Sequence, residues 1–208
     1  MTGTVFVKSY EAPEWDRREI LRYASAGEGN AEVLALLEEC IAESAPRLCY
    51  NVCYAYFPVK REGEATDLGF AITRSKDLKK NLGDCQKAVV FAATVGLGID
   101  RLVARYAHVS PAKALLFDAI GSERVEALCD AFNSEIMVEA VWQGCFTRPR
   151  FSPGYGDLPL ELQREIFRVL SPEKRIGAAL TQSLLASPSK TVTAIIGVER
   201  LNKFIFGD

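Results

Sequence analysis

The stretch Ala88-Val-Val-Phe-Ala-Ala-Thr-Val95 decides the fold class. Apolar residues stand at consecutive positions, so both faces of the stretch are expected to be buried, as in a central strand covered on both sides. Gly96-Leu97-Gly98 follows directly and predicts a tight turn into a helix over 100–108. Dinucleotide-binding loops share this Gly-x-Gly spacing, but Arg101 stands where their fingerprint requires a third glycine. We therefore favour a packing turn over a phosphate site here.

Downstream, the sequence predicts a long helix and two shorter ones. Ser110-Pro111 combines an N-cap residue with proline at the first helical position, and apolar residues at helical spacing continue to about 144. Gly121 is a candidate break or kink in this helix. Pro159 opens a second helix through Leu170, and Ser171-Pro172 caps a final turn that ends near Gly177.

The remaining segments alternate irregularly between predicted strands and helices. We expect an edge strand within 1–10, a helix from Pro13 to the glycines at 27 and 29, and a helix over 30–44 with Asn30 as N-cap. Further along, we expect a hairpin of 48–60 with 67–74 and a helix over 75–82. Two strands, over 178–185 and 191–198, are expected near the C-terminal end. No βα unit repeats. The pattern favours an α+β fold, with a mainly antiparallel sheet and flanking helices in a single domain over 1–208.

The composition and charge of the chain argue against several classes of protein. The chain has 208 residues, 49% of them hydrophobic and 25% charged, and a net charge of −2. Such a balance is typical of soluble globular proteins and gives no basic surface for nucleic acid. We find neither an apolar run long enough for a membrane nor a signal peptide, so we expect a cytoplasmic protein. The six cysteines lie mostly in apolar periodic segments, and we expect small buried side chains rather than disulfides or metal ligands.

Catalytic side chains are scarce. The single histidine, His108, falls near a predicted helix C-terminus, where a positive charge complements the helix dipole. No second histidine or tight acidic cluster indicates a metal site, and no G-x-S-x-G elbow indicates a serine nucleophile. We therefore expect no catalytic residue and no metal. A hydrolase that uses His108 is the remaining alternative.

A shaped loop, Arg148-Pro-Arg-Phe-Ser-Pro-Gly-Tyr-Gly-Asp-Leu-Pro159, separates two predicted helices. Three prolines and two glycines exclude regular structure and fix a specific backbone path. Either this is an ordinary turn or it is a binding site. The second interpretation rests on Arg150, which can bind a carboxylate with its fork, on the close backbone approach at Gly154, and on the aromatic face of Tyr155. These groups suit a zwitterionic or cationic ligand.

The string from Arg150 to Glu161, together with Ile176-Gly-Ala-Ala-Leu-Thr-Gln-Ser183 and Lys190-Thr-Val-Thr-Ala-Ile-Ile-Gly197, resembles the activation domain of cobalamin-dependent methionine synthase, in particular its short stand-alone relatives. Phe91-Ala-Ala-Thr-Val-Gly96 and the segment from Asp118 to Asp130 are similar as well. The resemblance covers roughly residues 15 to 200.

The resemblance implies that the chain binds S-adenosylmethionine. Arg150 would hold the methionine carboxylate, Ser152, Gly154 and Tyr155 would line the pocket, and Asp130 would meet the amino group. Two positions depart from the family. Gln182 replaces a glutamate, and the aromatic residue of the family's last strand falls in Ala194-Ile195-Ile196.

By the same resemblance, the chain would be an accessory module rather than an enzyme alone. It would support reductive remethylation of cobalamin on a separate methionine synthase or other corrinoid protein, with a flavodoxin-type electron donor. Cobalamin would be present only in trans, because His108 lies in no Asp-x-His-x-x-Gly context. The alternative is a corrinoid-protein binding or assembly module that keeps the fold without S-adenosylmethionine chemistry.

Overall fold

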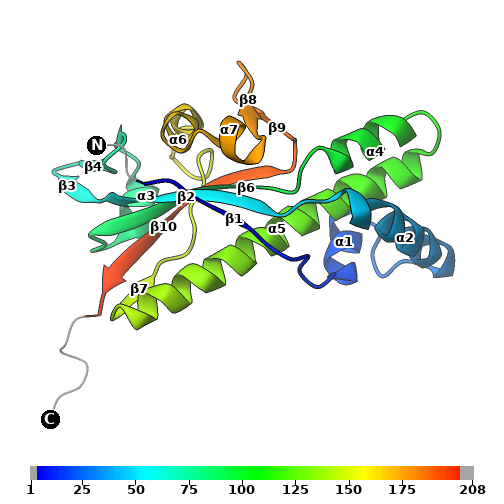
Figure 1. The fold of residues 1–208 in the computed structure, drawn as a ribbon, viewed down its shortest axis with the longest axis horizontal. Coiled ribbons are helices and arrows are strands. Elements are labelled where there is room, and N and C mark those ends of the chain that lie inside the picture. Colours follow the sequence, from blue (N-terminus) through cyan, green and yellow to red (C-terminus); the bar gives the residue numbers. More distant parts are fainter. Residues whose placement is uncertain (1–3, 202–208) are drawn as a thin grey trace, which may run out of the picture.

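A five-stranded antiparallel sheet forms the centre of the molecule (Figure 1). The structure is a computed structural model, and it describes residues 4–201. The strands lie in the order β1-β2-β6-β10-β7, with bounds Phe6–Ser9, Asn51–Pro58, Lys87–Thr94, Thr191–Arg200 and Cys145–Thr147. β6 lies in the middle, as its two apolar faces predict. It pairs with β2 and β10 over its whole length, from Thr94 opposite Asn51 and Thr191 to Lys87 opposite Pro58 and Val198.

Helices cover both faces of this sheet. On one face lies α5 (Pro111–Trp142), which packs Leu128, Phe132 and Ile136 against alternate residues of the strands, among them Val89 and Phe91. The other face is covered by α3 (Lys76–Leu82), α6 (Leu162–Leu170) and α7 (Pro172–Ile176), which meet the intervening residues such as Val90 and Ala92. Because successive side chains of a strand point to opposite faces of the sheet, alternate residues of β6 lie in two separate cores.

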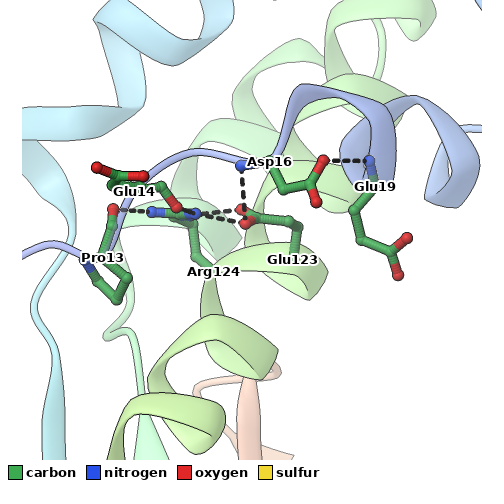
Figure 2. A network of polar contacts seen from close by, with 6 residues as sticks. All are labelled: Pro13, Glu14, Asp16, Glu19, Glu123 and Arg124. Atoms are coloured by element: carbon green, nitrogen blue, oxygen red, sulfur yellow. Dashed lines mark hydrogen bonds and ion pairs between the residues drawn. The ribbon is translucent and has the colours of Figure 1, made fainter.

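A third core lies beside the sheet, where only helices meet. It joins α1 (Arg17–Tyr23), α2 (Ala31–Ser44), α4 (Gly98–Tyr106) and the first half of α5. The chain enters this region through a buried polar network (Figure 2). Arg124 of α5 donates to the Pro13 and Glu14 carbonyls at 2.6 Å each and makes a bidentate contact with Glu123. Its guanidinium also lies 4.2 Å from the centre of the Trp15 ring.

The predicted N-caps Asn30 and Ser110 are confirmed, since they cap α2 and α5 through their side-chain oxygens, and α7 ends at Gly177 as expected. Ser75, expected as the first residue of a helix, is the N-cap of α3, and α6 begins at Leu162 rather than at Pro159. The helix expected from Pro13 to the glycines at 27 and 29 is shorter than predicted, because α1 begins after its N-cap Asp16 and ends at Tyr23. Gly121 does not break α5. A Cβ there would overlap Ile99 and Lys190, so the glycine provides close packing instead.

Two strand predictions were wrong. The expected hairpin of 48–60 with 67–74 does not form, because β2 pairs with β1 and β6. Instead, β3 (Lys60–Glu62), β4 (Ala65–Asp67) and β5 (Ile72–Thr73) make a separate small sheet. Only two residues of the expected strand 178–185 are extended, in β8 (Ala179–Leu180), which pairs with β9 (Ala186–Ser187).

The remaining comparisons with the sequence-based expectations concern short segments and single residues. Residues 45–47 form a short 3-10 helix, η1 (Ala45–Arg47), and the first three residues of the predicted edge strand lie outside the described part. Five cysteines are buried as predicted, but Cys49 is exposed, because it precedes β2 rather than lying within it. His108 lies in an exposed turn just beyond the end of α4.

Candidate functional site

The loop 148–159 continues the edge of the sheet rather than leaving it. After β7, Arg148 N donates to Gly197 O at 2.8 Å, and Phe151 exchanges two backbone hydrogen bonds of 2.9 Å with Ile195. The chain then turns. Gly154 N donates to Leu158 O at 2.9 Å, and Leu158 is buried in the core below. This backbone gives the loop one fixed path beside β10.

Asp157 fastens the loop to α3. Its carboxylate accepts hydrogen bonds from Ser75 Oγ, from Lys76 N at 2.7 Å and from Asp77 N at 3.2 Å, and Asp157 N donates back to Asp77 Oδ2 at 3.2 Å. The Ser75 hydroxyl and these amides at the helix N-terminus lower the pKa of Asp157. Gly156 has φ +53°, and a Cβ there would overlap Asp77 Oδ2, so the contact requires glycine.

A cavity of about 370 Å³ lies between this loop, α5, α6 and the start of β10. Its walls are the side chains and backbone of the loop residues Arg150, Phe151, Ser152, Pro153 and Tyr155, of Glu126 on α5, of Gln163 on α6 and of Thr191, Val192 and Thr193 on β10. This volume falls within the range of sites for small organic ligands. Tyr155 is 69% exposed, so its ring is free to cover a bound molecule.

Arg150 lies between two carboxylates of α5. It donates to Glu126 Oε2 and to Asp130 Oδ1, each at 2.5 Å. Partial burial of the guanidinium disfavours its charged form, but the hydrogen bond to Asp130 and the nearby negative charges outweigh this, and the pKa of Arg150 is raised. Two carboxylates and one guanidinium leave a local charge of −1. Such a site favours a ligand with net positive charge.

The structure brings four of the five predicted site residues to this cavity or its rim. Arg150, Ser152 and Tyr155 line it, and Asp130 reaches it through the ion pair with Arg150. Gly154 is not in the wall. Its φ of +90° serves the turn that ends at Leu158. The ligand contacts of these residues stay predictions.

Residues from three other elements complete the site, and sequence reasoning missed them. Glu126 stands one helical turn before Asp130, so the i, i+4 spacing on α5 was available as a clue. Residues 191–193 lie in Lys190–Gly197, one of the segments that carry the resemblance, but nothing in the sequence places them at the loop. Gln163 gave no clue, because only the fold brings α6 to the loop.

The two departures from the family pattern are not in the wall of the cavity. Gln182 is exposed in the turn between β8 and β9, and its carbonyl is 3.4 Å from Arg164 Nη2. Ile195 is fully buried in the core under α6. Within residues 4–201, no group of three or more His, Cys, Asp or Glu side chains is placed to hold a metal ion.

None of the helices between residues 4 and 201 combines the length and the apolar character that crossing a membrane requires. No protein-family profile matches the sequence, and no curated protein matches it. A solved structure of the MetH reactivation domain bound to AdoHcy does match in three dimensions. The TM-score is 0.70 at 16% identity, and the match covers 97% of this chain and 80% of that one. The chain has the fold of the MetH reactivation domain.

Proposed function

We propose that this chain binds S-adenosylmethionine and acts as a stand-alone reactivation module for cobalamin on a separate methionine synthase or other corrinoid protein. The observation that carries the proposal is the cavity between the loop and β10, with its charge of −1 from Glu126, Asp130 and Arg150. S-adenosylmethionine carries a sulfonium, an ammonium and a carboxylate, and so a net charge of +1. Its charge complements that of the cavity.

The solved domain of the same fold contains AdoHcy, the demethylated form of this ligand. In this chain, Arg150 is suited to the ligand carboxylate, while Glu126 and Asp130 are suited to its ammonium group. Tyr155 offers an aromatic face for the adenine or the sulfonium. The ligand would exchange with the existing ion pairs without leaving a buried charge alone.

The contribution of the chain to the reaction is positioning. When the sulfonium methyl is transferred, its bond to sulfur breaks and AdoHcy remains, so the protein needs no nucleophile of its own. It has to hold the methyl group in line with the partner's reduced cobalt. A flavodoxin-type donor would supply the electron. The partner, the donor and a cytoplasmic location belong to this proposal.

Calorimetry with S-adenosylmethionine tests the pocket. We expect saturable binding that weakens more than about tenfold in Arg150→Ala, because a charge-assisted contact to the ligand is lost. Arg168→Ala is the matched control, since Arg168 forms an exposed ion pair on α6 outside the cavity. No binding at millimolar ligand, or equal binding by wild type and Arg150→Ala, contradicts the proposal.

One observation favours a second candidate function. Arg150 already has a carboxylate on each of two guanidinium nitrogens, so a carboxylate ligand must displace a partner. A binding or assembly module for a corrinoid protein, without S-adenosylmethionine chemistry, would keep this closed arrangement. A pull-down with a corrinoid protein, followed by transfer of labelled methyl from S-adenosylmethionine under a chemical reductant, separates the two. The second candidate predicts capture without transfer.

A further inference from the structure

A second cavity, of about 430 Å³, lies at the start of α4 and shares no lining residue with the first. Three arginines surround it, Arg47 from η1 and both Arg101 and Arg105 from α4. Its remaining wall is largely apolar and includes Leu97, Leu102 and Cys49. The glycines at 96 and 98 have a packing role here, because a Cβ on Gly98 would overlap the Arg47 carbonyl.

The positive charge of this cavity is only partly balanced. Among residues 4–201, Glu43 is the one carboxylate within 4 Å of these arginines, at 3.9 Å from Arg47 and 3.6 Å from Arg105, and it also accepts a hydrogen bond from Tyr106. Within residues 4–201, Arg101 contacts no carboxylate. Arg101 and Arg105 stand at i and i+4 on α4, where like charges repel. Three guanidinium groups against one carboxylate leave a local charge of +2.

We propose that this cavity binds a phosphate-bearing small molecule with an apolar portion. Guanidinium forks match the oxygens of a phosphate, and a dianion offsets the charge of +2 more fully than a single carboxylate does. The apolar portion would lie against Leu97 and Leu102. The inference is independent of the proposed function, because the two cavities use different residues and opposite charge.

Cys49 provides a built-in reporter for this cavity. It is the one cysteine of the six that is not buried, so a small alkylating reagent reaches it first. Alkylation by iodoacetamide is followed by mass spectrometry, with and without inorganic phosphate or phenyl phosphate. We expect saturable protection of Cys49 by phenyl phosphate, at a lower concentration than by inorganic phosphate, because the apolar wall contributes to binding.

The arginines are tested by substitution. Arg101→Ala should raise the half-protecting concentration of phenyl phosphate about tenfold. Arg18→Ala, an exposed arginine on α1, should leave it unchanged. In the wild type, anionic iodoacetate should also react faster relative to neutral iodoacetamide than it does in Arg101→Ala, which reports the local charge without any ligand.

Four results would overturn the inference. These are no protection at millimolar phenyl phosphate, protection that sodium chloride reproduces at equal ionic strength, equal protection in wild type and Arg101→Ala, and benzoate binding as tightly as phenyl phosphate. The last result would assign the cavity to carboxylates. None of these measurements depends on whether S-adenosylmethionine binds.

Discussion

Two groups of arginine and acidic side chains at α5 have the same chemistry but differ in burial and in charge balance. Arg124 and Glu123 are 0% and 3% exposed, and the Pro13 and Glu14 carbonyls accept two further hydrogen bonds from the guanidinium. The second cluster joins Glu126 and Asp130, about one and two turns further along α5, to Arg150 of the loop. These three side chains are 39%, 71% and 26% exposed, and they carry one carboxylate in excess. The first cluster is complete by itself, and the second has an unbalanced charge and an adjoining cavity. Burial together with charge balance therefore separates a structural cluster from a candidate binding site.

The largest effect should follow from breaking the buried cluster. Arg124→Met removes the partner of Glu123 and leaves the Pro13 and Glu14 carbonyls without their donor. We expect a loss of about 3–5 kcal/mol in the free energy of unfolding, measured by urea denaturation. Replacing both members, with Glu123→Gln added, should recover part of this loss. Arg150→Ala should cost less than about 1 kcal/mol, since its cluster is partly solvated. Similar losses of unfolding free energy in Arg124→Met and Arg150→Ala would contradict the distinction between a buried structural cluster and a partly solvated one.

The second prediction concerns the excess charge beside Arg150. Glu126→Gln keeps the shape of the side chain but brings the local charge from −1 to zero. We expect the affinity for S-adenosylmethionine to fall about tenfold, and that for AdoHcy, which lacks the sulfonium charge, to fall less. Calorimetry with both ligands measures the two ratios. Equal losses for both ligands would mean that shape, and not charge, determines the preference.

A smaller effect is expected where the loop is fastened to α3. Asp157→Asn removes the charge that accepts from Ser75, Lys76 and Asp77, so the loop should hold Tyr155 and Arg150 less precisely. We expect the affinity for S-adenosylmethionine to fall about fivefold. Asp84→Asn, on an exposed residue outside both cavities, serves as control. Unchanged affinity would show that the backbone pairing at Phe151 suffices.

The same contact predicts a pH dependence. The pKa of Asp157 is lower in the folded protein than in the unfolded chain, so its contribution to stability is present at neutral pH. The contribution is lost as pH falls from about 4, the pKa of a free aspartate, through the lower pKa of Asp157 in the folded protein. The difference in urea midpoint between wild type and Asp157→Asn should therefore shrink as the pH is lowered below about 4. A difference that stays constant between neutral and acidic pH would contradict this assignment.

The smallest effect is expected at Gln182. Gln182→Glu restores the carboxylate of the family pattern, but the side chain is exposed between β8 and β9, outside the cavity wall. We expect the affinity for S-adenosylmethionine to change less than about twofold, since solvent and salt screen a distant surface charge. A large gain in calorimetric affinity would show that this turn moves to the cavity when the ligand binds.

The parts of the fold that the sequence predicts well are those determined within a few residues. The caps at Asn30, Ser75 and Ser110 depend on a side chain and an amide three positions later. The two apolar faces of 88–95 likewise predict a central strand by themselves. Strand pairing has no such local cause. Residues 48–60 were assigned to the next extended segment, whereas the actual neighbours of β2 are β6 and β1.

The residues of the candidate site likewise fall into two groups, those that a single stretch of sequence indicates and those that only the fold brings together. Arg150, Ser152 and Tyr155 lie in one loop of unusual composition, and the loop attracted attention for that reason. Asp157 belongs to the same loop, but its partners are about 80 residues earlier, and nothing near Asp157 in the sequence indicates them. The segment 191–193 became part of the wall because β10 inserts between β6 and β7.

That insertion has a consequence for how the chain acquires its structure. Thr191 lies opposite Thr94, 97 positions away in the sequence, so the middle of the sheet closes only after a long loop has been brought together. The entropy of such a closure slows folding relative to a helical bundle of similar length. Until β10 arrives, β6 has one neighbour and an open edge, to which other chains can pair. During synthesis, this edge of β6 therefore stays unpaired until the whole of β10, Thr191–Arg200, has left the ribosome.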